Sequence, residues 1–182
     1  MVEESNYIKD IVIPSAALIV SVAAVYFTWK GLKLQRAHNI KSMKPIGKFK
    51  LGDYESKLLI GIDNYGVGPL ILKSLVLNGH NMKNGETFLK HFDFNELPKT
   101  KWQNFTGFQK DRTIPSGGYL PLLEWSIDND LKKSEEDIEL TKKICRRNFK
   151  DWVVKITYTD IYESEVFTEE LELDWFGRKL KP

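Results

Sequence analysis

Residues 58 to 77 read LLIGIDNYGVGPLILKSLVL, two apolar runs joined by a short connection. Short apolar runs bounded by glycine, proline and asparagine are typical of buried β-strands. The connection contains Asn64, Gly66, Gly68 and Pro69. We predict a hairpin or bulged turn in which Asn64, Gly66 or Gly68 adopts a positive φ. This stretch indicates a protein built mainly from strands.

The same glycines also allow a phosphate-binding loop. A P-loop has the pattern G-x-x-x-x-G-K-[ST] before a helix, because backbone N–H groups and the lysine hold the phosphates. Gly61 and Gly66 have this spacing, but Val67 and Gly68 replace the lysine and the hydroxyl residue. Pro69 removes a further N–H donor, and a strand-like run follows. These residues favour a connection between strands over a nucleotide site.

Further strand patterns occur up to the C-terminus. Residues 112 to 126 hold a turn with Pro115 and Gly117 and then an apolar run. Residues 152 to 160, WVVKITYTD, alternate in polarity and end at Asp160, and the run that follows reads as their hairpin partner. These patterns predict the turns of an antiparallel sheet.

Residues 134 to 149, SEEDIELTKKICRRNF, break the strand series. Acidic side chains crowd the first turn and basic ones the last, which suits the helix dipole, and Ser134 is a good N-cap. Cys145 is expected to be a packed thiol on the inward face of this helix. The predicted fold is therefore mainly β, an Ig-like β-sandwich with one inserted helix.

Residues 11 to 29, IVIPSAALIVSVAAVYFTW, contain no charged side chain. A helix of this length spans about 30 Å, the thickness of the hydrocarbon core, so we predict a transmembrane helix. A cleaved signal peptide is the alternative, because Ser21 and Ala23 resemble a cleavage site. The acidic first ten residues and the continuation of the apolar run favour the transmembrane helix.

Charge on the two sides of this helix predicts its direction. Residues 30 to 50 carry seven basic and no acidic side chains, whereas residues 1 to 10 carry a net charge of −2. The positive-inside rule places the N-terminus outside and residues 30 to 182 in the cytoplasm, as a single-pass membrane protein. A single cysteine agrees with this, because small extracellular domains often rely on disulfides.

We therefore divide the chain into four parts: an extracytoplasmic tail (1–10), a transmembrane helix (11–29), a partly helical basic juxtamembrane neck (30–45) and a cytoplasmic β-sandwich (46–182) with the helix at 134–149. The neck is expected to contact anionic lipid of the bilayer through its basic side chains. These are Lys30, Lys33, Arg36, Lys41 and Lys44.

Small residues lie along one stripe of the membrane helix, namely Ala17, Ser21 and Ala24. Small side chains let two membrane helices approach closely, so this stripe predicts a homo-oligomer. We do not expect a nucleic-acid partner, because the basic neck lacks interleaved aromatic residues.

The histidines give little indication of chemistry. His80, His91 and Asp93 could bind a metal or form a hydrolytic group, but their spacing matches no known helical or hairpin pair. We interpret both histidines as solvated loop residues. The sequence predicts no catalytic residue, no cofactor and no metal.

In their order along the chain, these motifs resemble those of a group of uncharacterised bacterial single-pass membrane-anchored β-sandwich proteins. The shared motifs are an HNxxSxxP neck, an NxGxGP turn, an IPxG turn and a hairpin with YxDxY. The matching residues are His38, Asn39, Ser42, Pro45, Asn64, Gly66, Gly68, Pro69, Ile114, Pro115, Gly117, Tyr158, Asp160 and Tyr162. Glu163 stands where the group usually has glycine. The resemblance implies a β-sandwich behind a single-pass anchor and no established activity.

Three functions fit these features. The first is a membrane-anchored cytoplasmic binding or scaffold module without catalytic activity, which recognises an unidentified partner protein or a ligand. The alternative is a ligand-sensing membrane effector, as in antiphage defence, that acts by oligomerising in the membrane. The third is a hydrolase that uses His80, His91 and Asp93.

Overall fold

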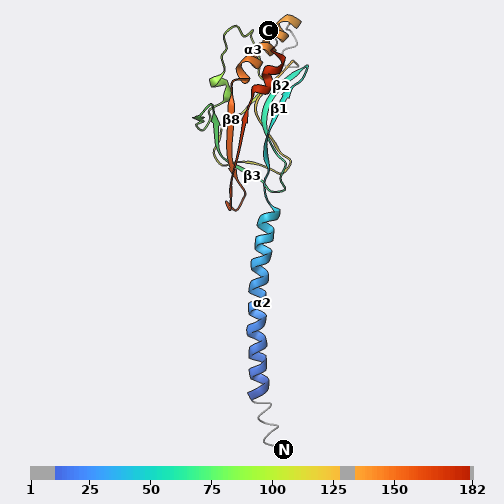
Figure 1. Cartoon of the computed structure of the whole chain (residues 1–182), viewed down its shortest axis with the longest axis vertical. Coiled ribbons are helices and arrows are strands. Elements are labelled where there is room, and N and C mark those ends of the chain that lie inside the picture. Colours follow the sequence, from blue (N-terminus) through green and yellow to red (C-terminus); the bar gives the residue numbers. More distant parts are fainter. Residues whose placement is uncertain (1–10, 128–133, 181–182) are drawn as a thin grey trace, which may run out of the picture. The chain divides into compact units, whose positions relative to one another are not determined.

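The structure, a computed structural model, describes residues 11–127 and 134–180 (Figure 1). The predicted extracytoplasmic tail, residues 1–10, lies outside the described residues. Contacts between α-carbons divide the chain into two units, residues 1–42 and 43–182, and each is described by itself.

The first unit consists of the long helix α2 (Ile13–Ser42), 30 residues with no buried side chain. Its length and hydropathy suffice to cross a membrane. The predicted membrane segment and most of the predicted neck thus form one continuous helix. It ends shortly before Pro45, as expected, because the residue before a proline disfavours the helical conformation.

The second unit is a β-sandwich of two antiparallel sheets, which confirms the predicted architecture. One sheet has the strand order β1-β2-β7-β5, and the other has the order β4-β3-β8-β9, with β6 also paired to β3. The strands are β1 (Gly47–Asp53), β2 (Lys57–Asn64), β3 (Leu70–Leu77), β4 (His80–Asn81), β5 (Asn104–Phe105), β6 (Arg112–Ile114), β7 (Tyr119–Ser126), β8 (Val153–Thr159) and β9 (Val166–Glu172).

Helical segments complete the second unit: η2 (Phe88–His91), α3 (Glu135–Phe149) and η4 (Asp174–Lys179). The predicted helix is confirmed as α3, and its N-cap Ser134 accepts a hydrogen bond from the N–H of Asp137 at 3.2 Å. The helices α3 and η4 lie together at one end of the sandwich (Figure 1).

The hydrophobic core lies between the two sheets and continues under α3. Strands β2 and β3 supply much of it, because nearly all residues of β2 and half of those of β3 are buried. Cys145 is fully buried, as expected, and joins Phe149 and Trp152 in the part of the core beside α3. Burial of these side chains is the main favourable free-energy term for the fold.

The connection between β2 and β3 differs from the prediction. It is not a hairpin, because β2 and β3 belong to different sheets and residues 64–69 cross between them. The predicted positive φ is also wrong, since Asn64, Gly66 and Gly68 all have negative or extended φ. Glycine is needed here for close approach: a Cβ on Gly68 would overlap the backbone carbonyl of Met43.

The predicted turns at Gly117 and between β8 and β9 lie where expected, and a further tight turn joins β3 to β4. Strands β8 and β9 form an antiparallel hairpin, and Glu163 in its turn has a φ of 50°. Asn78 and Gly79 join β3 to β4 with φ values of 49° and 78°, as in the tight turns that favour Asn-Gly. Gly117, between β6 and β7, has a φ of 67°.

Candidate functional site

Turn motifs that are far apart in the sequence meet around the side chain of Asn64. Its hydrogen-bond partners are the N–H groups of Ile46 and Gly66 and the carbonyl oxygens of Gly68, Ile114 and Pro115, at 2.8 to 3.2 Å. The first residues of the sandwich are thereby joined to the β2–β3 and β6–β7 connections, each of which crosses between the sheets. These motifs hold the fold together at the end where the chain enters the domain.

Asp160 has a similar local role in the β8–β9 hairpin. Its carboxylate accepts hydrogen bonds from the N–H groups of Tyr162, at 2.7 Å, and Ser164, at 3.2 Å, and from the Ser164 hydroxyl. Burial alone would raise the pKa of Asp160, but these hydrogen bonds outweigh it and lower the pKa. Both oxygens of the carboxylate therefore accept hydrogen bonds from residues of the turn, so the side chain stabilises the hairpin.

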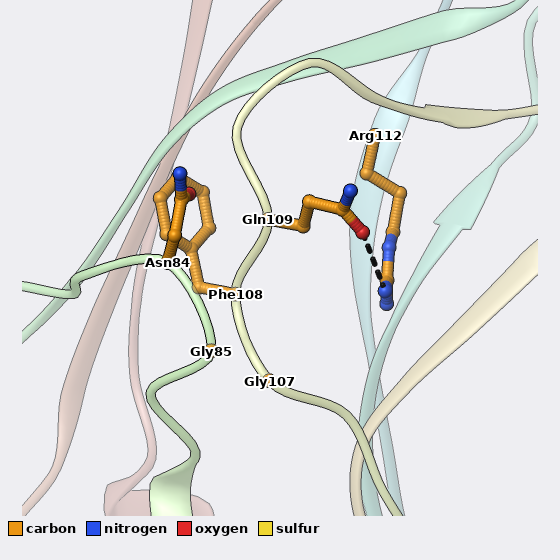
Figure 2. Close-up of a pocket in the computed structure, with 6 residues that line it drawn as sticks. All are labelled: Asn84, Gly85, Gly107, Phe108, Gln109 and Arg112. Carbon is orange, nitrogen blue, oxygen red and sulfur yellow. Dashed lines mark hydrogen bonds between the residues drawn. The ribbon is translucent and has the colours of Figure 1, made fainter.

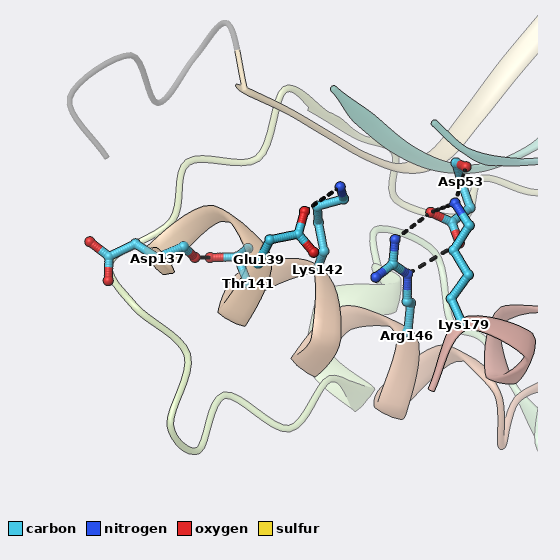
Figure 3. Close-up of polar contacts among 7 residues, drawn as sticks. All are labelled: Asp53, Asp137, Glu139, Thr141, Lys142, Arg146 and Lys179. Carbon is cyan, nitrogen blue, oxygen red and sulfur yellow. Dashed lines mark hydrogen bonds and ion pairs between the residues drawn. The ribbon is translucent and has the colours of Figure 1, made fainter. Parts of the chain in front are cut away.

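A buried ion-pair group joins α3 and η4 to the end of β1 (Figure 3). The Arg146 guanidinium donates to both carboxylate oxygens of Asp53, at 3.1 and 2.9 Å, and Lys179 Nζ lies 3.2 Å from the same carboxylate. Burial would raise the pKa of Asp53, but the hydrogen bonds from Arg146 and Lys179 hold it below its ordinary value. Because the carboxylate is fully enclosed, we interpret this group as structural.

The long connection between β3 and β6, residues 78–111, is called here the side segment. Its regular elements are only β4, η2 and β5. Because β4 pairs with β3 and β5 pairs with β7, it runs along the same side of both sheets. Long connections with so little regular structure are uncommon in compact domains and are often functional.

A cavity of about 540 Å³ opens in this region (Figure 2). Its lining residues are Asn84, Gly85, Gly107, Phe108, Gln109 and Arg112. Two backbone hydrogen bonds hold its walls together, from Gly85 N–H to the Phe108 carbonyl at 2.7 Å and from Phe108 N–H to the Glu86 carbonyl at 2.8 Å. The side-chain amides and the guanidinium that line it can form hydrogen bonds to a ligand. They do not gain or lose protons near neutral pH, so they suit binding rather than acid–base catalysis.

Next to this cavity in sequence, three side chains of the side segment converge. Each oxygen of the Glu86 carboxylate lies near one histidine. His80 Nε2, on β4, is 3.2 Å from Oε2, and His91 Nε2, on η2, is 3.3 Å from Oε1. The two imidazole ring centroids lie 5.0 Å apart. We call His80, Glu86 and His91 the His–Glu–His group; its ligand atoms all lie within 4.8 Å of one another, so it could hold a metal ion.

The Glu86 carboxylate is buried, with only 4% of the side chain exposed. It accepts hydrogen bonds from the Lys83 backbone N–H at 2.8 Å, from Lys90 Nζ at 2.9 Å and from His80. These interactions hold the pKa of Glu86 far below its usual range. The Glu86 carboxylate therefore stays ionised near neutral pH.

This arrangement corrects the interpretation of the histidines as independent solvated loop residues. They meet across a shared carboxylate, and that carboxylate belongs to Glu86 rather than to Asp93. Asp93 instead accepts a hydrogen bond from the N–H of Asn95 at 2.9 Å. Sequence reasoning missed Glu86 because only the path of the side segment brings it between the two histidines.

The remaining predicted site residues lie on or just after α2. The small residues form its stripe, where the Ser21 hydroxyl donates to the Ala17 carbonyl at 2.8 Å. Four of the five predicted lipid-facing basic residues are exposed on α2: Lys30, Lys33, Arg36 and Lys41. Lys44 belongs to the second unit, where it lies 3.3 Å from Glu165 and 4.5 Å from the ring centroid of Phe167.

Comparison with known proteins gives no family for this chain. No protein-family model matches it, and no curated protein matches it.

Proposed function

We propose that this chain is a membrane-anchored binding module without catalytic activity, which recognises a partner protein or a ligand. The observation that carries the proposal is the direct succession of two parts along the chain. A helix long enough to cross a membrane ends at Ser42, and a folded sandwich begins at the next residue. Such a chain holds a rigid domain at a membrane surface.

The charge pattern supports an orientation with the sandwich in the cytoplasm, and the resemblance to bacterial membrane-anchored proteins supports a bacterial inner membrane as the location. Seven basic side chains follow the apolar segment, and the ten residues before it are net acidic. The basic side chains on the last turns of α2 are exposed and suit anionic lipid headgroups. A reporter fused after Pro182 tests the orientation: activity in the cytoplasm is expected, and activity on the outer side would overturn it.

The side segment is the proposed recognition surface. It exposes two large aromatic side chains, Phe94 and Phe105, each with about half of its surface accessible. Exposed aromatic residues are common anchors in protein interfaces, because they bury a large apolar area with few rotatable bonds. The cavity beside Arg112 adds hydrogen-bonding groups for a polar part of the same partner.

Site-specific photo-crosslinking in native membranes tests this assignment. A photoreactive amino acid at Phe94 or Phe105 is expected to give one discrete adduct. The same amino acid at Val166, which is exposed on β9 in the edge strand of the second sheet, is the matched control. Equal adducts at Val166, or none at either phenylalanine, would contradict the proposal.

A further inference from the structure

We propose that His80, Glu86 and His91 form a binding site for a divalent transition-metal ion, and that zinc fits the ligand set best. This goes beyond the proposed binding function and does not depend on it. Two imidazole nitrogens and one carboxylate oxygen are ligands that zinc takes in proteins, usually with a fourth position for water or another ligand.

The distances between the ligand atoms suit such an ion. Zinc bonds of about 2.1 Å in a tetrahedral arrangement place neighbouring ligand atoms about 3.4 Å apart. The Glu86 carboxylate oxygens lie 3.2 Å from His80 Nε2 and 3.3 Å from His91 Nε2. Each histidine nitrogen therefore already lies at the required distance from one oxygen of the carboxylate, and one ligand atom from each of the three residues lies within 4.8 Å of the others.

The unsatisfied nitrogen of His91 is a second and independent observation. His91 Nε2 is closed off from solvent and makes no hydrogen bond to any of the described residues. Glu86 Oε1 is near it, but that contact satisfies only an ion-pair distance and not hydrogen-bond geometry. Buried polar atoms nearly always have a partner, and a metal ion would use the lone pair of this nitrogen.

The position of the group gives the ion a structural consequence. The three ligands come from β4, from the turn after it and from η2, all within residues 80–91 of the side segment. An ion there would tie these elements together beside Gly85, which lines the cavity. Metal binding would thus brace the part of the side segment that adjoins the cavity.

Lys90 is the competitor that the structure shows for this site. Its ammonium lies 2.9 Å from Glu86 Oε1 and supplies the positive charge that a metal ion would bring. The Lys90 side chain is 67% exposed, so it can leave the carboxylate without steric hindrance. Removing this lysine should therefore tighten metal binding. If the His–Glu–His group is only a hydrogen-bonded cluster, neither the wild-type chain nor the chain without Lys90 would bind a metal.

The test uses the full, untagged chain in detergent micelles, titrated with Co²⁺ as a visible probe and then with Zn²⁺ as its competitor. One equivalent of Co²⁺ with the intense absorption of a four-coordinate ion is expected, displaced by one equivalent of Zn²⁺. His80→Ala and Glu86→Gln should each weaken binding at least about 100-fold, because each removes a direct ligand. Lys90→Ala should strengthen binding about 10-fold, the reverse of the ligand variants.

The chain provides a matched control, because His38 on α2 is the one histidine outside the group. His38→Ala should leave the affinity and the spectrum unchanged. The fold of each variant is checked by the resistance of the buried Cys145 thiol to alkylation. No stoichiometric Co²⁺ binding by the wild-type chain would overturn the proposal. So would binding that survives His80→Ala in a folded protein, or binding lost in His38→Ala.

Discussion

Gly68 lies so close to the backbone carbonyl of Met43 that a β-carbon at position 68 would overlap it. Met43 is the first residue of the sandwich unit, and Gly68 is in the crossover between the two sheets. The side chain of Asn64 bonds to the same crossover and to Ile46. The first residues of the domain, Met43 and Ile46, are therefore held against the crossover between β2 and β3.

Gly68→Ala is expected to destabilise the sandwich by about 2–4 kcal/mol, because backbone on one side or the other must move. The single cysteine makes the measurement simple, since alkylation of buried Cys145 requires opening of the core. The matched control is Gly31→Ala on α2, where an added β-carbon meets nothing within 4 Å. An unchanged alkylation rate in Gly68→Ala would show that this close approach is unimportant.

Glu163→Gly and Glu163→Ala separate backbone strain from an ion pair. Glu163 has a φ of 50°, and a residue other than glycine pays roughly 1 kcal/mol or more there. Both variants lose the exposed contact to Lys73 at 2.6 Å, and only glycine also removes the strain. The glycine variant should unfold at a higher urea concentration than the alanine variant, by about 1 kcal/mol in stability. Equal urea midpoints would contradict this.

The buried pair of Asp53 and Arg146 predicts a loss of stability in acid. The pKa of Asp53 is lower in the folded protein than its ordinary value, so its carboxylate stabilises the fold above that ordinary pKa. This contribution is lost as the pH falls from about 4 toward the lower folded value. Asp53→Asn should cost about 3 kcal/mol at neutral pH, because it leaves Arg146 buried without its anion.

Urea unfolding at pH 7 and pH 3 measures this effect. The difference between the wild type and Asp53→Asn should shrink at the lower pH. Asp151→Asn is the surface control, because Asp151 is 73% exposed and lies 3.8 Å from Lys150. Its small effect should not change between the two conditions, and a pH-independent cost of Asp53→Asn would refute the assignment.

The small-residue stripe of α2 predicts self-association in the membrane. Ala17→Leu or Ser21→Leu should weaken it about tenfold, because a larger side chain separates the two helices. Ala23→Leu makes the same change away from the stripe and should have little effect. Energy transfer between labelled chains in lipid vesicles measures the association. If expression harms the host cell and Ala17→Leu relieves the harm, the effector function gains support over the passive module.

Several elements could be predicted because their causes are local. The uncharged run from Ile11 to Trp29 favours a membrane helix by its length and composition alone. The alternation in β8 and the cap at Ser134 likewise act within a few residues of the chain. The β8–β9 hairpin joins neighbours in sequence, so its turn could also be recognised.

The sequence by itself determined which segments are apolar, which alternate in polarity and where charge gathers, and these decide the helix and the strands. Only the tertiary structure decided that β2 and β3 lie in different sheets and that Glu86 stands between His80 and His91. The physical reason is that apolar pattern and capping act over a few residues. A shared carboxylate, or a glycine pressed against a distant carbonyl, depends on where the whole backbone brings separate segments together.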